Sequence, residues 1–318
     1  MRTTILTGSG PLVVEPTTTR DLAEVVDTDR DRVDDMLRTT GALLFRGFAV
    51  GDADEFARVV SALSPEPLDY VYRSTPRSSV TAGVFTTTEY PQEQEITLHC
   101  ENAYQRQWPK RLAFCCLTPA AAGGETPIAD MRAVTAAVGA ELVDRFAERG
   151  VRYLRHYRPY MDLSWQDVFQ TTSRAELAEF CAANDIEHEW LDEQTLRTAQ
   201  VSQGVATHPE TGERVFFNQA HLFHVSNLPP EPAAALVKLL GVDRLPRNAY
   251  FGDGGELDLA DLDRVRDAFR NAAIIFPWCT GDVLLIDNMR MAHGRRPFTG
   301  TRKVLASLMD VHSPAEAP

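Results

Sequence analysis

From Leu98 onward, the 318-residue chain is dominated by apolar runs of strand length. Residues 111–120 (RLAFCCLTPA) form one continuous run, and residues 281–311 hold two more, joined by a basic turn. Apolar runs of about four to eight residues flanked by glycine or proline are typical of buried strands. Because amphipathic helices lie beside and between these runs, the pattern predicts a mainly β fold with helical additions, of the α+β type.

The order of the remaining elements narrows the fold further. A strand at 41–50 between helices at 29–37 and 52–63 predicts a helix–strand–helix order at the N-terminus. Further elements are predicted as strands at 125–131 and 151–157, a hairpin at 204–219, and helices at 132–149, 164–186, 231–240 and 261–273. Residues 64–98 are loop-rich and predict an active-site rim or lid.

No repeat or linker divides the chain, so we expect one domain over residues 1–318. The expected architecture is a double-stranded β-helix, or jelly roll. Its core would run from about residue 98 to 312, with a helical insertion at about 132–200.

Charge and cysteine usage limit the partners and the compartment. The net charge of −13 argues against nucleic acid and against an anionic membrane surface, because both require clustered Lys and Arg. The N-terminal residues resemble neither a secretion signal nor a membrane span. The five cysteines form no CxxC pair and no even-numbered framework. A reducing, cytoplasmic location is therefore expected.

His99 and Glu101 are candidate metal ligands. On an extended segment, residues two apart project from the same face, so both side chains can reach one ion. A third ligand, His293, would complete two histidines and one carboxylate, the facial triad of Fe(II) oxygenases. The alternatives are a chance HxE on a surface strand, and a histidine in a polar turn capped by Asp287 or Asn288.

Arg302 follows His293 by nine residues and begins the apolar segment RKVLASLMD. We expect that segment to be a strand pairing beside His293. A guanidinium there would bind the distal carboxylate of a keto-diacid as a bidentate pair. The alternative is an ordinary exposed arginine at the start of a strand.

Four motifs occur together in one order, and their combination is specific. They are HCENAY (99–104), GGETPIAD (123–130), ERVFFNQAHLFH (213–224) and DNMRMAHGRRPFTGTR (287–302). Between about residues 41 and 310 the chain resembles the taurine dioxygenase-like superfamily. The resemblance is closest to its syringomycin-hydroxylase-like and clavaminate-synthase-like branch.

The resemblance implies a set of ligands and cosubstrates. Fe(II) would be held by His99, Glu101 and His293, with no catalytic side chain beyond these ligands. Arg302 would pair with the C5 carboxylate of 2-oxoglutarate, Thr126 would donate its hydroxyl to the same cosubstrate, and O2 would be the second cosubstrate. Taurine dioxygenase has Asp where this chain has Glu101, a departure that favours the amino-acid-modifying branch over a sulfonate substrate.

Candidates for substrate binding lie near the motifs, each with core packing or local hydrogen bonding as the alternative. They are Asn102, Tyr104, Asn218, His221 and His224. Arg296 is a further candidate, for a substrate carboxylate, with a solvated basic turn as its alternative. His221 and His224 are spaced for a second metal, but no carboxylate lies close to them in the sequence.

The resemblance further implies hydroxylation of an unactivated C–H bond, with succinate and CO2 as coproducts. The substrate would be an amino acid, free or tethered to a carrier protein, in specialised-metabolite biosynthesis. Desaturation, epoxidation and cyclisation use the same residues and stay open, as does a non-catalytic metal-binding jelly roll. Halogenation is disfavoured because Glu101 occupies the halide position. The sequence predicts no oligomeric state.

Overall fold

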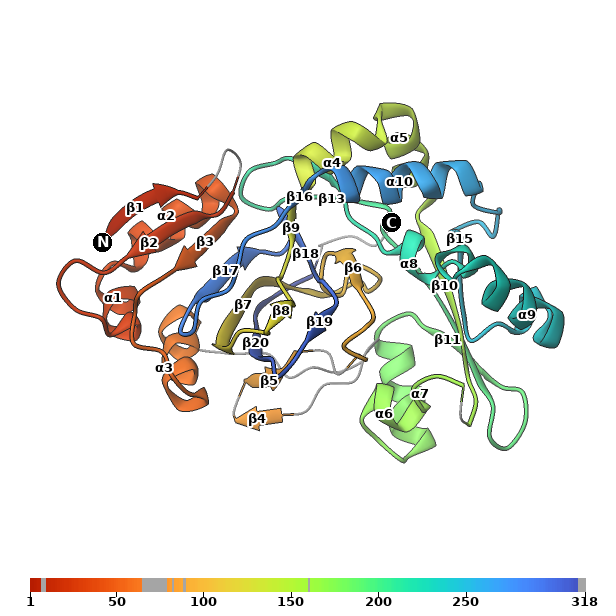
Figure 1. Ribbon diagram of the computed structural model, residues 1–318. Coiled ribbons are helices and arrows are strands. Elements are labelled where there is room, and N and C mark those ends of the chain that lie inside the picture. The colour runs from red at the N-terminus through yellow and green to blue at the C-terminus, as the bar shows by residue number, and fades with distance from the viewer. Residues whose placement is uncertain (7–9, 65–78, 82, 88–89, 160, 314–318) are drawn as a thin grey trace.

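The computed structural model describes residues 1–6, 10–64, 79–81, 83–87, 90–159 and 161–313 (Figure 1). Its largest sheet has the strand order β1-β2-β3-β17-β7-β20-β5-β4. The strands are β1 (Arg2–Ile5), β2 (Leu12–Glu15), β3 (Ala42–Phe45), β17 (Val283–Asp287), β7 (Trp108–Thr118), β20 (Lys303–His312), β5 (Val84–Thr86) and β4 (Ser79–Thr81). The N-terminal segment thus contributes strands to the same sheet as the C-terminal segment.

A second sheet has the order β16-β9-β18-β6. Its strands are β16 (Ala273–Ile274), β9 (Ile128–Asp130), β18 (Met291–Arg295) and β6 (Ile96–His99). Phe114 and Leu284 of the large sheet share one buried cluster with Ile128 and Met291 of the second. Two sheets around a common apolar core form the double-stranded β-helix, which confirms the predicted fold class.

A third sheet, ordered β11-β12-β10-β15, lies beside this core (Figure 1). Its strands are β11 (Glu187–Trp190), β12 (Leu196–Ser202), β10 (Val151–Tyr157) and β15 (Arg247–Phe251). Two smaller pairs are β13 (Val205–Thr207) with β14 (Arg214–Phe216), and β8 (Ala122–Gly123) with β19 (Phe298–Thr299). The β13–β14 pair confirms the predicted hairpin. The segment expected to be a helical insertion contains strands as well.

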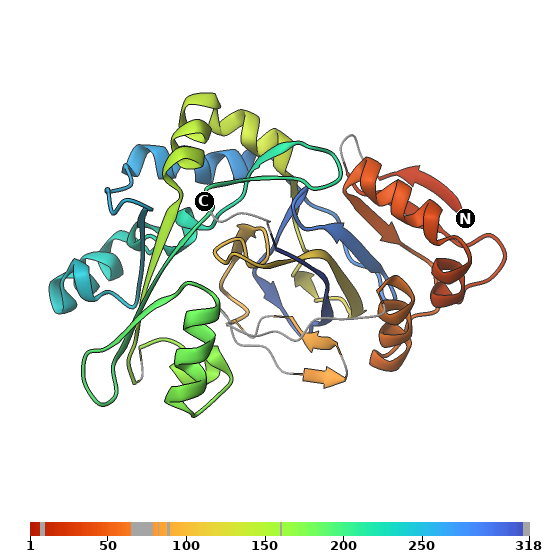
Figure 2. The same cartoon turned by 180° about the vertical axis from the view of Figure 1, so that it is seen from behind.

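Helices cover the sheets on several sides. Figure 2 shows α1 (Leu22–Thr28), α2 (Arg30–Thr40) and α3 (Ala53–Leu63) beside the N-terminal strands. The others are α4 (Met131–Val138), α5 (Ala140–Arg149), α6 (Trp165–Phe169), α7 (Arg174–Ala183), α8 (Ala220–Phe223), α9 (Pro230–Leu240) and α10 (Leu259–Asn271), with 3-10 turns η1 (Val225–Asn227) and η2 (Val242–Arg244). Among the described residues, no helix is long and apolar enough to span a membrane.

Local sequence explains where α3 begins and why α4 and α5 are separate helices. The side chain of the N-cap residue Asp52 accepts the Glu55 N–H (2.8 Å), which caps the start of α3, and the Glu55 carboxylate accepts the N–H of the preceding Gly51 (2.6 Å). The prediction of one helix over 132–149 is wrong, because Gly139 has a φ of +87° and separates α4 from α5. Helical φ is negative, and a residue at +87° ends the run.

The C-terminal prediction of two strands joined by a basic turn is also wrong. The segment forms four strands, β17 to β20, and His293 lies in the middle of β18. β20 pairs with β7 and β5, whereas β18 pairs with β9 and β6, so the strand after Arg302 does not lie beside His293. Pairing between distant strands depends on which faces are buried in the whole fold, and no local pattern specifies it.

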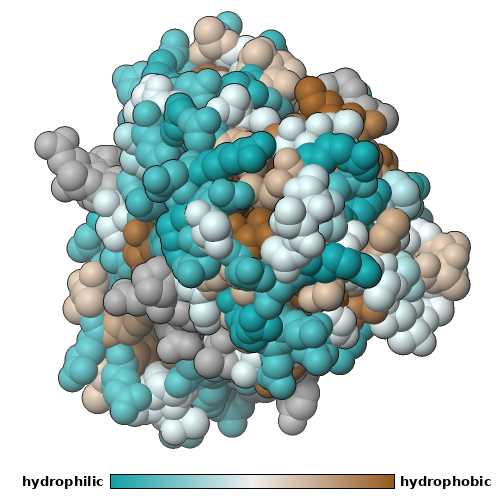
Figure 3. Space-filling view, turned by 90° about the vertical axis from the view of Figure 1, so that its left-hand side faces the viewer, coloured by the Kyte–Doolittle hydropathy of each residue, from teal (hydrophilic) through white to brown (hydrophobic). Residues whose placement is uncertain are grey.

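The segment predicted to be loop-rich contains β4, β5 and β6. The rest of the predicted rim or lid includes residues 65–78, 82 and 88–89, which lie outside the described residues. Figure 3 shows the face that carries the N-terminal elements, where hydrophilic side chains predominate and apolar ones form small separate patches. Scattered exposed apolar residues are ordinary on a protein surface.

Candidate metal centre

The backbone places His99 and His293 opposite each other. His99 ends β6, His293 lies in β18, and the two are direct partners in the antiparallel pairing. Their ring centroids are 4.6 Å apart. A Cβ on Gly294 would lie 2.5 Å from the carbonyl oxygen of Ile96, so only glycine lets β18 approach β6 this closely.

The imidazole nitrogens face the Glu101 carboxylate. The Nδ1 of His99 lies 2.8 Å from the Thr97 carbonyl oxygen, and because a carbonyl only accepts, Nδ1 carries the proton. The His99 Nε2 then carries no proton and lies 4.0 Å from Glu101 Oε2. The His293 Nε2 lies 3.5 Å from the same oxygen. A histidine that donates its Nδ1–H to a carbonyl presents Nε2 as the ligand atom, which is the usual arrangement at metal sites.

These three side chains fit a divalent cation. One ligand atom from each of His99, Glu101 and His293 lies within 4.8 Å of the others. Glu101 is only 3% exposed, and the His293 Nδ1 is buried with no partner among the described residues. A buried carboxylate that faces two imidazole nitrogens gains strongly from a cation between them. The predicted ligands are thus brought together, and the donor set suits Fe(II).

Glu101 lies in a turn, residues 100–105, that follows β6. Side chains from distant segments bind its carbonyl groups: Gln219 Nε2 donates to Cys100 O (2.7 Å), Asn288 Nδ2 to Glu101 O (2.9 Å), Gln203 Nε2 to Ala103 O (2.9 Å), and Ser202 Oγ to Tyr104 O (3.0 Å). Asn288 Oδ1 also accepts the Glu101 N–H (2.7 Å). We call residues 100–105 the ligand turn. Side chains from other segments thus hold its backbone in place.

Asn288→Ala is expected to destabilise the fold by about 3 kcal/mol, since it breaks three hydrogen bonds of about 1 kcal/mol each and leaves their partners buried. Asn288 is fully buried, and its third bond goes to Pro109 O (2.8 Å). Urea denaturation measures the loss. Exposed Asn271 is the matched control, and Asn271→Ala should change stability by less than about 0.5 kcal/mol. Equal stability of the two variants would contradict the role given to Asn288.

Arg302 lies beside the segment that precedes β9. Its Nε donates to Gly124 O (2.8 Å), its Nη1 to Thr87 Oγ1 (3.4 Å) and its Nη2 to Thr126 Oγ1 (3.4 Å). The segment continues directly to the metal ligands, because the Gly294 N–H donates to Pro127 O (3.0 Å). Arg302 and Thr126 are thus brought together, although by a strand arrangement that differs from the predicted one.

The Arg302 guanidinium is well suited to an anion. Burial, and then the charge of Arg295, lower the pKa of Arg302 to about 10. No carboxylate lies within ion-pair distance of Arg302 among the described residues. A half-buried cation with only neutral partners loses part of its hydration, and a bidentate carboxylate relieves that cost. The distal carboxylate of 2-oxoglutarate fits this requirement.

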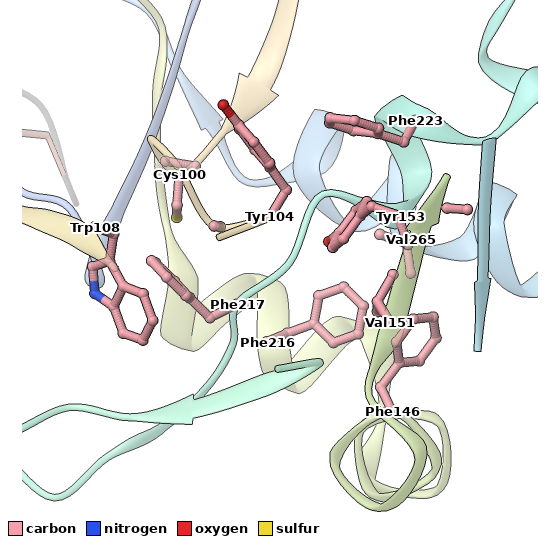
Figure 4. Close-up of a cluster of buried hydrophobic side chains, with 14 of the residues drawn as sticks. Cys100, Tyr104, Trp108, Phe146, Val151, Tyr153, Phe216, Phe217, Phe223 and Val265 are labelled. Carbon is pink, nitrogen blue, oxygen red and sulfur yellow. The ribbon is translucent and has the colours of Figure 1, made fainter. Parts of the chain in front are cut away.

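Tyr104 and Asn102, two substrate candidates, lie in the ligand turn. Tyr104 is buried and packs with Tyr153 and Phe223 at ring-centroid distances of 6.2 and 5.2 Å (Figure 4). Asn102 has a φ of +56°, and its buried Oδ1 has no partner among the described residues. Packing thus accounts for Tyr104, and a role of either residue in substrate binding remains a prediction.

Asn218, His221 and His224 are buried and have internal partners. Asn218 bonds Gly204 O (2.7 Å) and the Ala220 N–H (3.0 Å). His221 stacks on Phe269, with 4.7 Å between ring centroids, and burial lowers the pKa of His221 to about 3. The His224 Nδ1 lies 2.8 Å from Ser226 Oγ. Local structure accounts for all three positions.

Arg296 differs from these because its side chain is 49% exposed, with its guanidinium 3.7 Å from the Glu125 carboxylate. Its substrate role also remains a prediction.

A cavity of about 150 Å³ opens beside His99. Its lining combines acidic Glu95, basic Arg247 and apolar Leu222 and Phe223. It therefore offers both charges and an apolar wall next to a metal ligand.

Sequence reasoning missed three residues of this region. Asn288 was considered only as a cap for His293, whereas it fixes the ligand turn. Thr87 and Trp278 were not considered, yet both reach the Arg302–Thr126 pair, since Trp278 Nε1 donates to Thr126 Oγ1 (3.2 Å). Neither Thr87 nor Trp278 carries a local sequence signal that links it to Thr126.

Comparison with known proteins gives consistent matches. The model of the taurine catabolism dioxygenase TauD, TfdA family matches residues 6–309. The dapdiamide synthesis protein DdaC of Enterobacter agglomerans is 43% identical over 278 residues, which are 87% of this chain and 84% of DdaC. A clavaminate synthase-like protein of Arabidopsis thaliana is 35% identical over 300 residues, 90% of this chain and 86% of that protein.

Solved structures are similar in fold. PvcB from Pseudomonas aeruginosa superposes with a TM-score of 0.54 at 16% identity, over 96% of this chain and 88% of PvcB. At that identity the likeness supports the fold alone.

Proposed function

Because the chain belongs to the taurine catabolism dioxygenase TauD, TfdA family, we propose that it hydroxylates an unactivated C–H bond of an amino acid, free or tethered to a carrier protein. The protein is a non-haem dioxygenase that depends on Fe(II), 2-oxoglutarate and O2. Relatives with names from dapdiamide and clavaminate synthesis support a role in specialised-metabolite biosynthesis.

His99, Glu101 and His293 are the proposed Fe(II) ligands, and Arg302 with Thr126 the proposed site for the C5 carboxylate of 2-oxoglutarate. The observation that carries the proposal is the convergence of two imidazoles and one carboxylate within 4.8 Å. The half-buried Arg302, which has only neutral hydrogen-bond partners among the described residues, supports the second part.

In the proposed reaction the side chains of this protein hold and orient the reactants, and the bound metal with its cosubstrate provides the oxidising power. Held by His99, Glu101 and His293, Fe(II) with 2-oxoglutarate would supply the oxidising power for C–H hydroxylation by O2, with succinate and CO2 as coproducts. The Glu101 carboxylate partly neutralises the positive charge of the metal, and Arg302 orients 2-oxoglutarate through its C5 carboxylate. The rings of Phe114 and His293 lie 5.1 Å apart, so an apolar wall limits water on that side. No side chain needs to act as a nucleophile or general base.

The cavity beside His99 supports an amino acid as substrate. Asp162 holds Arg247 there, with 2.6 Å between its Oδ1 and Arg247 Nη2. A guanidinium and the Glu95 carboxylate in one cavity complement the two charges of a free amino acid. The apolar Leu222 and Phe223 complement its side chain.

Succinate release tests the proposal. The Fe(II)-loaded protein, given 2-oxoglutarate and O2, is expected to form succinate faster with a subset of amino acids or with an aminoacyl carrier protein. Mass spectrometry of the product distinguishes hydroxylation, which adds one oxygen atom, from desaturation, which removes a hydrogen pair. Succinate formation that no substrate of either kind accelerates would contradict the proposed substrate class. Absence of succinate under all conditions would indicate a non-catalytic binding protein.

A further inference from the structure

The hydroxyl group of Thr126 lies between two groups that can only donate. Trp278 Nε1 donates to Thr126 Oγ1 at 3.2 Å, and Arg302 Nη2 donates to the same atom at 3.4 Å. An indole N–H and a guanidinium have no acceptor atoms. Thr126 Oγ1 is therefore an acceptor in both contacts, and its single proton must point to a third group.

We propose that Trp278 is a positioning residue for the cosubstrate, because it fixes the Thr126 hydroxyl as a donor to the 2-oxoglutarate C5 carboxylate. This inference rests on the proposed assignment of Arg302 and Thr126 to that carboxylate. Trp278 acts through Thr126 and does not touch the cosubstrate itself.

The N–H groups of Arg302 also favour a carboxylate at this place. A guanidinium carries five N–H bonds, and three are used by Gly124 O, Thr87 Oγ1 and Thr126 Oγ1. Two remain, one on each Nη. These two N–H groups and the Thr126 hydroxyl proton offer three donors and no acceptor; we call this set the donor cradle. An ionised carboxylate at the end of the cosubstrate accepts from all of them, whereas a methyl group there leaves them without partners.

Packing holds Trp278 in this orientation. Its side chain is buried, lies in the core cluster between the two main sheets, and contacts Phe276 edge to face at 5.9 Å between centroids. Thr126 precedes β9, Trp278 precedes β17 and Arg302 precedes β20, so three separate strand entries form the donor cradle. Rigid placement of a donor in advance lowers the entropic cost of binding the carboxylate.

The test compares two keto acids that share a chelating head. Affinities of Fe(II)-loaded protein for 2-oxoglutarate and for 2-oxopentanoate, which lacks the C5 carboxylate, are measured anaerobically by the visible charge-transfer band. Trp278→Phe keeps the aromatic ring and removes the N–H. It should weaken 2-oxoglutarate binding roughly 3- to 10-fold and leave 2-oxopentanoate binding unchanged. An unchanged ratio of the two affinities would overturn the inference.

Trp108 supplies the matched control. It is equally an indole in the core, 2% exposed, and its Nε1 has no partner among the described residues. Trp108→Phe should leave the ratio of affinities at the wild-type value. If Trp108→Phe lowered the ratio of 2-oxoglutarate affinity to 2-oxopentanoate affinity as much as Trp278→Phe does, the effect would be one of general packing, and the inference would be overturned.

A double-mutant cycle tests the route through Thr126. Once Thr126→Val has removed the hydroxyl, adding Trp278→Phe should cause no further loss of 2-oxoglutarate affinity. Thr126→Ser, which keeps the hydroxyl, should retain most of the effect of Trp278. Additive losses in the double variant would contradict the positioning role. If wild-type protein binds no 2-oxoglutarate, the proposed function fails first, and the two failures are distinguishable.

Discussion

Purified His293→Ala protein is expected to bind Fe(II) at least about 100-fold more weakly than wild type and to release no succinate from 2-oxoglutarate. Loss of a residue that merely hydrogen-bonds a metal ligand typically costs about 10- to 100-fold in affinity, so loss of a direct ligand should exceed that. In β18, His293 Nε2 lies 3.5 Å from Glu101 Oε2, so the alanine variant removes one of the three proposed ligand atoms. Equilibrium titration with Fe(II) under anaerobic conditions measures the change.

Two further variants separate ligation from folding. Glu101→Gln keeps the side-chain shape and the ligand-turn hydrogen bonds of its backbone, yet it removes the negative charge, so it should also lose Fe(II). His188 is exposed in β11, and His188→Ala should bind Fe(II) as wild type does. A His293→Ala protein with near wild-type Fe(II) affinity would show that the metal lies elsewhere.

Arg302→Met is expected to weaken 2-oxoglutarate binding by about 100-fold, or about 3 kcal/mol, while Fe(II) affinity stays the same. Methionine preserves most of the length and apolar contact of arginine but removes every N–H. Hydrogen bonds to charged groups contribute about 1.5–3 kcal/mol each, and Arg302 has two N–H groups left for the carboxylate. Anaerobic titration of the Fe(II) protein with 2-oxoglutarate gives the affinity.

The control for Arg302 is Arg270, whose side chain is 69% exposed on α10. Arg270→Met should bind 2-oxoglutarate with wild-type affinity. If Arg302→Met bound 2-oxoglutarate as tightly as Arg270→Met, the anchor would have to be another residue, and the donor cradle formed with Thr126 would lose its role.

The metal ligands were predictable because their signals are local. The two-residue spacing of His99 and Glu101 needs only an extended segment, and His293 stands in an apolar segment with Arg302 nearby. The family resemblance then connected these segments. The structure brings all three side chains together, and β6 and β18 pair directly at the two histidines.

Features that depend on distant contacts were not predictable. The strand after Arg302 was expected beside His293, but it pairs with β7 and β5. Either pairing satisfies the apolar pattern of that strand, so only the packing of the whole barrel decides between them. Arg302 still reaches the site, because its side chain extends to Gly124 and Thr126.

Buried polar side chains explain the rest of what was missed. Asn288 satisfies the carbonyl groups of Glu101 and Pro109, although in the sequence it is an ordinary amide. A buried carbonyl needs a donor, and the residue that supplies it can come from any part of the chain. Such partners become visible only when the fold brings the segments together.

The central claim is that Fe(II) and 2-oxoglutarate bind together at His99, Glu101 and His293. The most direct test adds Fe(II) and 2-oxoglutarate to the metal-free protein without oxygen and records the visible spectrum. The account predicts a metal-to-ligand charge-transfer band that requires both components and is missing in Glu101→Gln. A wild-type protein that binds both components and shows no band, or a Glu101→Gln protein that retains it, would contradict the assignment.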